Sequence, residues 1–452
     1  GLLHDKLVEH NLLTKTELHE FRPRQPWTVG PFTLEGIHVT HSIVDAVALA
    51  IGTPLGTILH TGDFKLDQTP IDNRQSDLTR LAELGAAGVL LLLADSTNVD
   101  RPGTTPSERS VTRPIEDIMS HAQGKVLVAT FASHVHRIRQ VIELSQKQGR
   151  AIGVVGKSLI GNIEVARETG HIKVAPDALL EVGKIAGRDP KTVTLLTTGS
   201  QGEPLSALAR IATGVHPHVK LGPGDTVILS SRVIPGNERT IARLLDHLSR
   251  RGAEVYYEAL ACVHVSGHAS REELQLMLNL VRPRFFVPIH GEFRHLTRHC
   301  ALAREVGIDP AGVFLLEDGK ILEITDDGAY ITESVRAGRV FVDGLGGVEE
   351  EVLRDRRHMA EDGLVVAIVG IEQQTGELLT GPDLLSRGFL PSTNGAGFEA
   401  AKEAIRATLN ELPRESRMDV GVVKEQVRLS LRRYFRRTFG RRPVVLPFVM
   451  EM

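Results

Sequence analysis

Apolar positions follow two different patterns along the first hundred residues. The first 18 residues have the spacing of an amphipathic helix, with apolar side chains at Leu2, Leu3, Leu7 and Leu12. Short apolar runs then predict a series of strands at 28–29, 32–34, 37–39 and 48–51. A helix is expected over 77–84. The continuously apolar run from Val89 to Ala94 predicts a strand buried on both faces, which ends at Asp95.

The pattern changes after Arg101-Pro102-Gly103, where strands and helices begin to alternate. Strands are expected at 126–131, 152–155, 194–196 and 227–229, with helices at 136–147 and 237–250. This alternation predicts a parallel sheet with helices packed on it. Ligands of such sheets bind beyond the carboxyl ends of the strands, and the polar loops of this stretch all fall there.

From about Val255 the pattern of the first hundred residues returns. Ser270 and Glu273 have the spacing of a helix capping box, and 284–289 reads as a strand that leads to His290. Short strands are expected over 311–340, and Gly344-Leu345-Gly346-Gly347 is interpreted as a linker. A small α+β domain follows, with strands at 365–369 and 444–448 and helices at 399–411 and 422–437.

Composition narrows the class of protein. A chain of 452 residues is too long for one hydrophobic core. With 41% hydrophobic residues and a net charge of −3, it is an ordinary globular chain that leaves room for a local basic groove. The 2 cysteines, Cys262 and Cys300, argue against a disulfide framework and fit a reducing cytoplasm. No apolar run is long enough to cross a bilayer. Because the chain lacks an initial methionine and begins inside a helical pattern, we expect its true N-terminus to lie upstream.

Three residues at predicted strand ends are candidate metal ligands. Asp63 follows a glycine turn after an apolar run, and His41 and His290 end two other strands. An unpaired carboxylate at the edge of a core needs compensation, and imidazole with carboxylate suits zinc or manganese. A single histidine at a strand end is more often structural, so spacing alone leaves the two interpretations open.

Two further residues are candidates for catalysis. His268 follows Gly267 at the head of a predicted helix, a position that favours anions, so it can bind a phosphate oxygen or simply cap the helix. Asp95 ends a fully apolar strand and can orient a neighbouring histidine, although Asp-Ser-Thr-Asn would also suit a turn.

Phosphate contacts are expected from several loops that precede helices or follow strands. The His-Val-His sequence at 134–136 could be taken for metal ligands, but its place between a strand and a helix favours phosphate. The expected contacts are Ser133, His134, His136, Ser230, Ser231, His264, Ser266 and Gly267. The basic run from Arg432 to Arg442 is interpreted as a solvated helix face, with contact to a nucleic-acid backbone as the alternative.

Five motifs together resemble a known family. They are Thr40-His41-Ser42-Ile43, Thr61-Gly62-Asp63-Phe64-Lys65, Ala94-Asp95-Ser96-Thr97-Asn98, Ser266-Gly267-His268-Ala269 and Pro288-Ile289-His290-Gly291-Glu292. In this order they are similar to ribonuclease J, in the β-CASP branch of the metallo-β-lactamase superfamily. The resemblance implies an αββα metallo-β-lactamase domain over 1–103 and 261–343, interrupted by a parallel-sheet β-CASP domain over 104–260. A linker over 344–358 and a small α+β domain over 359–452 that helps dimerisation complete the expected architecture, and the basic run adds RNA contact as an expected role of this last domain.

The resemblance also assigns roles to the candidate residues. It implies that His41 binds one divalent ion, that His290 binds a second, and that Asp63 bridges the two. Asp95 and His268 match motifs that assist catalysis. The family's main metal motif, His-x-His-x-Asp-His, does not occur in these residues and is expected upstream of them. Val44-Asp45-Ala46 stands where Pro-Asp-Ser is expected.

The resulting hypothesis is a cytoplasmic ribonuclease that uses two divalent ions, Zn²⁺ or Mn²⁺, for RNA processing and decay. We expect 5′-to-3′ exonuclease and endonuclease activity on single-stranded RNA, with a preference for 5′-monophosphate ends. A homodimer or tetramer and partners in an RNA-degradation complex are expected, and no membrane. The alternatives are another hydrolase of the metallo-β-lactamase fold or a non-catalytic RNA-binding subunit.

Overall fold

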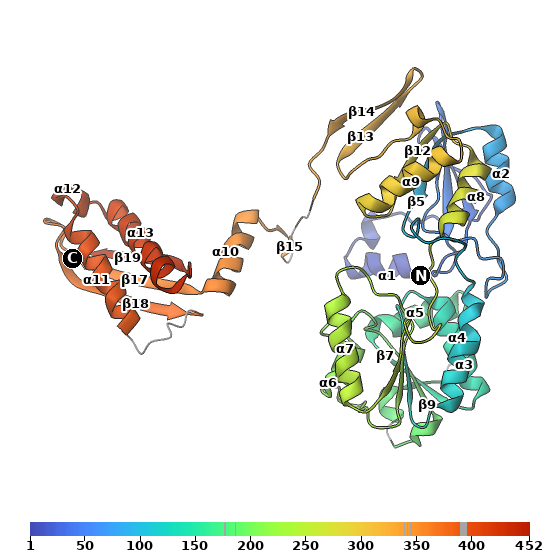
Figure 1. Cartoon of the computed structure of the whole chain (residues 1–452), viewed down its shortest axis with the longest axis horizontal. Coiled ribbons are helices and arrows are strands. Elements are labelled where there is room, and N and C mark those ends of the chain that lie inside the picture. The colour runs from blue at the N-terminus through green and yellow to red at the C-terminus, as the bar shows by residue number, and fades with distance from the viewer. Residues whose placement is uncertain (176–177, 186, 339, 341, 344–345, 389–395) are drawn as a thin grey trace. The chain divides into compact units, whose positions relative to one another are not determined.

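The first lobe of the protein is built on a six-stranded sheet (Figure 1). This computed structural model describes residues 1–175, 178–185, 187–338, 340, 342–343, 346–388 and 396–452. The strand order is β1-β2-β3-β4-β5-β12. The strands are β1 (Trp27–Val29), β2 (Phe32–His38), β3 (Val47–Thr53), β4 (Gly56–His60), β5 (Val89–Asp95) and β12 (Phe285–Ile289).

Apolar side chains cover both faces of this sheet. One face packs against three helices, α2 (Leu78–Ala87), α8 (Arg271–Val281) and α9 (Phe293–Glu305). The predicted capping box of Ser270 and Glu273 opens α8. The other face carries Leu91, Phe285 and Val287, which pack with residues of the hairpin formed by β13 (Lys320–Thr325) and β14 (Gly328–Ser334). Two-sided burial explains why Val89–Ala94 is apolar throughout.

The inserted lobe has a six-stranded sheet in which every pair is parallel, as predicted. The order is β11-β10-β6-β9-β7-β8. The strands are β6 (Val126–Ala129), β7 (Ala151–Val155), β8 (Leu179–Glu181), β9 (Val193–Thr197), β10 (Thr226–Leu229) and β11 (Glu254–Tyr256). The helices are α3 (Thr112–His121), α4 (Val135–Lys147), α5 (Lys157–Glu168), α6 (Ala207–Thr213) and α7 (Glu238–Arg250).

The C-terminal part forms a second compact unit, Arg336–Met452, separate from Gly1–Val335. Its sheet has the order β18-β17-β19, with strands β17 (Leu364–Ile371), β18 (Leu378–Arg387) and β19 (Val444–Glu451). Two helices, α11 (Ala396–Asn410) and α13 (Val420–Phe439), supply the other half of its core. The unit also contains α10 (Glu350–Asp362), α12 (Arg414–Arg417) and a two-stranded pair, β15 (Val342–Asp343) and β16 (Gly346–Gly347).

Several elements differ from the sequence-based expectation. The N-terminal helix α1 (Leu2–Glu9) is shorter than residues 1–18, because Asn11 adopts a left-handed φ of 55°. The stretches 32–34 and 37–39 were expected as separate strands, but β2 runs through both as far as His38. Gly344 and Leu345 of the expected linker lie outside the described residues, and α10 begins within 344–358. Among the described helices, none has the length and apolar character needed to cross a bilayer.

Candidate active site

Four strands of the first lobe end at the same edge of its sheet, and the candidate residues follow these ends. Strands β4, β5 and β12 are mutually parallel neighbours, and β2 is parallel to them because it is separated from β4 by two antiparallel pairings. The chain leaves this edge at His41, Asp63, Asp95 and His290. Residues more than 200 positions apart in the sequence therefore meet here.

The carboxylate of Asp63 presents one oxygen to each of two histidines. Its Oδ2 lies 4.0 Å from Nε2 of His41, and its Oδ1 lies 3.4 Å from Nδ1 of His290. The Asp63 side chain is 45% exposed, so it faces an accessible space. An added Cβ at Gly62 would come within 2.9 Å of the Val47 carbonyl oxygen, and φ there is +61°, so the turn before Asp63 requires glycine.

A buried carboxylate, Asp95, lies behind two histidines. Its Oδ2 accepts a hydrogen bond from Nδ1 of His268 at 2.7 Å, and its Oδ1 lies 3.2 Å from Nδ1 of His290. Burial alone would raise the pKa of Asp95, but the bonds from His268 and His290 outweigh burial and hold the pKa well below its usual range. The bond to Asp95 in turn raises the pKa of His290. Asp95 thus fixes the orientation of both rings.

The ring of His41 is held from the other side. Its Nδ1 lies 2.7 Å from the carbonyl oxygen of Gly267, so Nδ1 carries the proton. The lone pair of Nε2 accepts a hydrogen bond from Oγ of Ser42 at 3.3 Å, and Oδ2 of Asp63 lies 4.0 Å from the same nitrogen. Burial lowers the pKa of His41, which keeps the ring neutral. A Cβ at position 267 would come within 2.6 Å of this ring, so glycine is required for the contact.

The donor set fits divalent metal ions. Among the described residues, two groups bring their ligand atoms within 4.8 Å of one another: His41 with Asp63 and His268, and Asp95 with His268 and His290. Neutral imidazole and carboxylate are the ligands that zinc and manganese accept. The geometry thus joins His268 and Asp95 to the three residues singled out as metal ligands from the sequence.

A chain of polar contacts connects the His268 loop to the inserted lobe. The amide nitrogen of Asn98 donates to Oγ of Ser266 at 2.8 Å and to the carbonyl oxygen of His268 at 2.9 Å. The guanidinium of Arg232, which follows β10, donates to Oδ1 of Asn98 at 2.8 Å. Asn98 and Arg232 had no role in the sequence-based hypothesis, since a contact between residues 134 positions apart leaves no signal in spacing.

The remaining residues of the expected phosphate set lie in different surroundings. Ser133 is exposed at the start of α4, whereas His136 and His264 are largely buried, and burial lowers their pKa values to about 4 and about 3. Ser231 accepts a hydrogen bond from Gln201 at 3.3 Å. The structure therefore brings Ser266 and Gly267, but not His136, into contact with the metal-site histidines.

Ser230 and His134 belong to a buried polar network around Arg137. Ser230 donates to the carbonyl oxygen of Val263 at 2.7 Å and also contacts Arg137. His134 Nε2 lies 3.6 Å from Oε2 of Glu108, which accepts a hydrogen bond from Arg137 at 2.7 Å. These side chains lie in the interior, between the inserted sheet and the segment that enters it, where Nε2 of His134 and Oε1 of Glu108 have no described hydrogen-bond partner.

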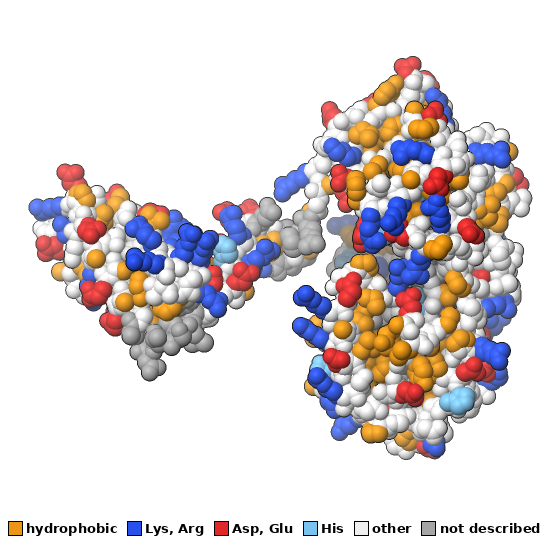
Figure 2. Space-filling model, in the orientation of Figure 1, with side chains coloured by type: hydrophobic (Ala, Val, Ile, Leu, Met, Phe, Trp, Pro, Cys, Tyr) orange, Lys and Arg blue, Asp and Glu red, His pale blue; other side chains and the backbone are white. Residues whose placement is uncertain are grey.

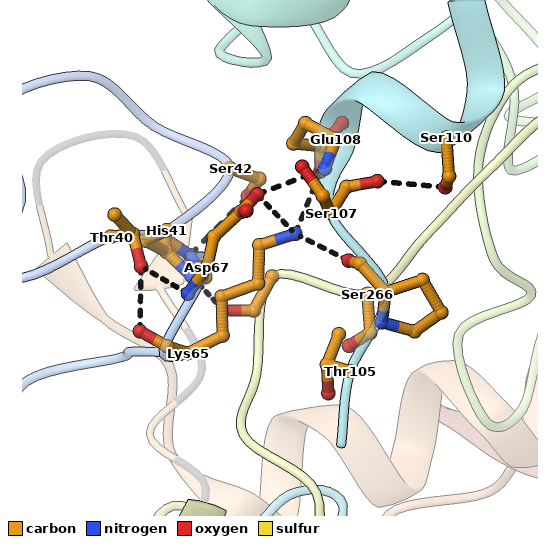
Figure 3. Close-up of polar contacts among 12 residues, drawn as sticks. Thr40, His41, Ser42, Lys65, Asp67, Thr105, Ser107, Glu108, Ser110 and Ser266 are labelled. Atoms are coloured by element: carbon orange, nitrogen blue, oxygen red, sulfur yellow. Dashed lines mark hydrogen bonds and ion pairs between the residues drawn. The ribbon is translucent and has the colours of Figure 1, made fainter. Parts of the chain in front are cut away.

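Lys65 extends this network into the first lobe. Its amino group lies 3.6 Å from Asp67 and 3.5 Å from Glu108, and donates to the carbonyl oxygen of Pro106 at 3.1 Å (Figure 3). Only 1% of the Lys65 side chain is exposed. Lys65 lies two residues after Asp63, so the buried charges tie the Asp63 loop to the start of the inserted lobe.

Three family models match this chain. The model described as "Ribonuclease J, beta-CASP domain" matches residues 123–248. The "Ribonuclease J C-terminal domain" model matches residues 351–452, and the "Zn-dependent metallo-hydrolase RNA specificity domain" model matches residues 237–311. The matches cover most of the inserted lobe, the segment that contains His268 and His290, and most of the C-terminal unit.

Individual relatives that match most of the chain are also named ribonuclease J or J2. Ribonuclease J2 of Bacillus subtilis is 37% identical over 100% of this chain and 82% of its own length. Ribonuclease J of Thermus thermophilus is 41% identical over 100% of this chain and 78% of its own length. Ribonuclease J of Synechocystis is 45% identical over 86% of this chain, and the match spans 61% of that relative.

Proposed function

The chain belongs to the ribonuclease J family, and from that premise we propose that it hydrolyses RNA with divalent metal ions, as both a 5′-to-3′ exonuclease and an endonuclease. The observation that carries the proposal is the meeting of His41, Asp63, Asp95, His268 and His290 at one edge of the sheet. In the proposed division, 1–103 and 261–343 form the metallo-β-lactamase domain and 104–260 the β-CASP domain. RNA processing and decay in the cytoplasm is the role that suits this activity.

We assign each residue of the site a role in this reaction. His41, Asp63 and His290 would hold two ions, Zn²⁺ or Mn²⁺, and the carboxylate of Asp63 is turned toward both histidines. Bound ions of this kind polarise phosphoryl oxygens and lower the pKa of bound water. Asp95 fixes the rings of His268 and His290, and His268 stands at the head of α8, where a developing negative charge on the phosphate is stabilised.

Product analysis tests the proposed activity directly. The purified full-length protein is incubated with single-stranded RNA labelled at either end, in Mn²⁺ or Zn²⁺. Mononucleotides released from the 5′ end support the exonuclease, and internal fragments support the endonuclease. Intact RNA under every metal condition would overturn the proposal.

The 5′-phosphate pocket is proposed at the junction of the two lobes. Ser266 and Gly267 lie beside His268 and His41. Asn98 bonds to Ser266 and accepts a hydrogen bond from Arg232, which places a positive charge next to this loop. Arg232 has no ion pair within the described part of the chain, so its charge remains available for an anion. Burial, followed by the nearby Arg101, lowers the pKa of Arg232, which indicates a site that gains from binding an anion.

We expect Ser266→Ala to lower the preference for 5′-monophosphate over 5′-hydroxyl RNA by about tenfold, the effect of losing one hydrogen bond to a charged group. Internal cleavage of the same RNA should change much less. The measurement is kcat/KM on RNAs that differ only in the 5′ group, including a bulkier 5′-triphosphate. An unchanged preference in the variant removes Ser266 from the pocket, and no preference in the wild type removes the pocket.

Dimerisation through the C-terminal unit is proposed from one face of its sheet. Leu446, Phe448 and Met450 alternate along β19 with residues that point into the core, and Phe448 is 57% exposed. Leu385 of β18 is exposed as well, and it pairs with Val366 of β17 next to Leu446. An exposed apolar surface of this kind is typical of an association site.

We expect Phe448→Glu to convert a dimer into a monomer, because a carboxylate in the centre of an apolar interface would be buried without a partner. Sedimentation velocity measures the change. The control is Leu205→Glu, which alters a side chain that is 92% exposed in the other unit and should remain dimeric. A Phe448→Glu variant, or a chain ending at Val335, that still sediments as a dimer would contradict the proposed interface.

A further inference from the structure

We propose that four arginines of α13 bind the sugar-phosphate backbone of single-stranded RNA at a second surface, within the C-terminal unit. The four are Arg432, Arg433, Arg436 and Arg437, here called the arginine face. The proposal rests on the proposed function, since it supplies a second contact for the same RNA. It assigns a binding role to a helix that contains none of the metal-site residues.

The helix separates an apolar side from this face. Val423, Val427, Leu431 and Phe435 recur every four residues and are buried against the sheet and α11. With about 100° per residue, Arg433 and Arg437 point away from that buried side, and Arg432 and Arg436 form a row beside them, nearer the buried side. All four are exposed, and Lys and Arg side chains gather over this helix in Figure 2.

The arginine face has no ion-pair partner within the part of the chain that the structure describes, although Arg432, after Arg428, helps to lower the pKa of Glu425. None of its four side chains forms an ion pair or hydrogen bond with a described residue. Other basic residues of the unit do: Arg428 pairs with Glu425, Arg406 with Glu403, Lys402 with Glu399 and Arg441 with Asp362. Lys424 and Arg387 also lack a described partner, but the four arginines stand together within six residues of α13, so their charge is concentrated there.

Helix stability alone does not account for the cluster. Cations in the last turn interact favourably with the helix dipole, which covers Arg436 and Arg437. Arg432 and Arg433 lie a turn earlier, where that effect fades. Each is also four residues from another arginine, and like charges at this spacing destabilise a helix. An external polyanion would turn this repulsion into a favourable contact.

A phosphate backbone suits the geometry better than an isolated anion. Within each row of the arginine face, the two arginines are four residues apart, about 6 Å along the axis. Guanidinium groups bind phosphate oxygens through paired N–H donors, and such contacts are independent of base sequence. The surface would thus hold RNA of any sequence, whereas the active site acts on one phosphate at a time.

The test measures RNA affinity against salt concentration for the full chain and for a variant in which all four arginines are replaced by glutamine. In a plot of log K against log salt, each phosphate of single-stranded RNA that the protein neutralises makes the slope steeper by about 0.7. The variant, which lacks four of the neutralising charges, should therefore have a slope that is shallower by up to about 3. For a long RNA, affinity at low salt should fall about tenfold or more, because the second contact is lost. An RNA of about five nucleotides is near the lower limit of single-strand site sizes. Its affinity should fall in the variant only to the extent that it binds the arginine face and not the active site.

A matched variant also removes four positive charges, but from side chains that form ion pairs. It carries Arg354→Gln, Lys402→Gln, Arg406→Gln and Arg428→Gln. It should keep the wild-type salt slope. Equal slopes for the arginine-face variant and the wild type would overturn the proposal, as would an equal loss in both variants, which would reflect net charge alone. Because binding is measured without turnover, a wild type that cleaves no RNA refutes the proposed function and leaves the slopes to decide the arginine face. Circular dichroism confirms that α13 still folds in both.

Discussion

His290→Ala is expected to lower RNA cleavage by about a thousandfold or more, because the loss of a metal ligand removes several kcal/mol of charge stabilisation from the transition state. One bound ion should be weakened far more than the other, since His290 and His41 face opposite oxygens of Asp63. The measurement combines single-turnover cleavage with the number of ions retained after gel filtration. Wild-type turnover with both ions retained would make His290 structural and the proposed metal site wrong.

The backbone at position 290 calls for a second variant. His290 has a left-handed φ of 56°, and Thr97 donates a hydrogen bond to its carbonyl oxygen at 3.0 Å. Alanine is strained in this conformation, whereas asparagine adopts it more readily. His290→Asn should therefore melt close to the wild type and still lose cleavage. If His290→Asn recovered most of the activity, strain rather than ligand loss would explain the alanine variant.

Glu108→Ala is expected to destabilise the N-terminal unit by about 3–5 kcal/mol, the usual effect of removing one partner from a buried ion pair. Burial alone would raise the pKa of Glu108, but His134 and Arg137 outweigh burial and hold the pKa well below its usual range, so the carboxylate is charged. Its removal leaves Lys65 and Arg137 as buried cations with fewer partners. Calorimetry should show the melting temperature of this unit falling by about 10 °C.

The C-terminal unit provides an internal reference in the same scan, because Glu108 lies outside it. The matched control is Glu143→Ala, which breaks an exposed pair with Arg139 and should change stability by less than about 1 kcal/mol. Replacing Glu108 with leucine and Arg137 with methionine together should restore part of the loss, since no unpaired charge between these two remains. A Glu108→Ala variant as stable as the control would show that the network does not hold the lobes together.

Periodicity was sufficient to predict the elements whose burial is simple. The fully apolar run Val89–Ala94 and four of the six parallel strands of the inserted lobe were recognised because both faces of those strands are covered, whereas the three-residue strands β8 and β11 were missed. The strand β18 was missed because its leucines come in adjacent pairs, not in alternation, on either side of Gly381-Pro382, a sequence typical of turns. The helix α10 was missed because charged residues dominate it and few apolar positions mark its period.

The site was predictable only in part, for a related reason. His41, Asp63, Asp95, His268 and His290 each follow a strand or open a helix, so local pattern marked them. The buried charges of Lys65, Glu108 and Arg137 gave no such signal, because charged residues are usually exposed and their partners lie up to 126 positions away. The same holds for Arg232 and Asn98, whose contact depends on how the inserted lobe meets the first.

The central claim is that this edge of the sheet holds the metal ions that act on RNA. The most direct measurement counts the divalent ions bound per chain by mass spectrometry and follows single-turnover RNA cleavage on the same preparation, before chelation, after chelation and after Mn²⁺ or Zn²⁺ is restored. Cleavage should disappear as the ions are removed and return when they are restored, in the wild type but not in an Asp63→Asn variant. Cleavage that persists in the metal-free wild type, or that returns equally in Asp63→Asn, would contradict the claim.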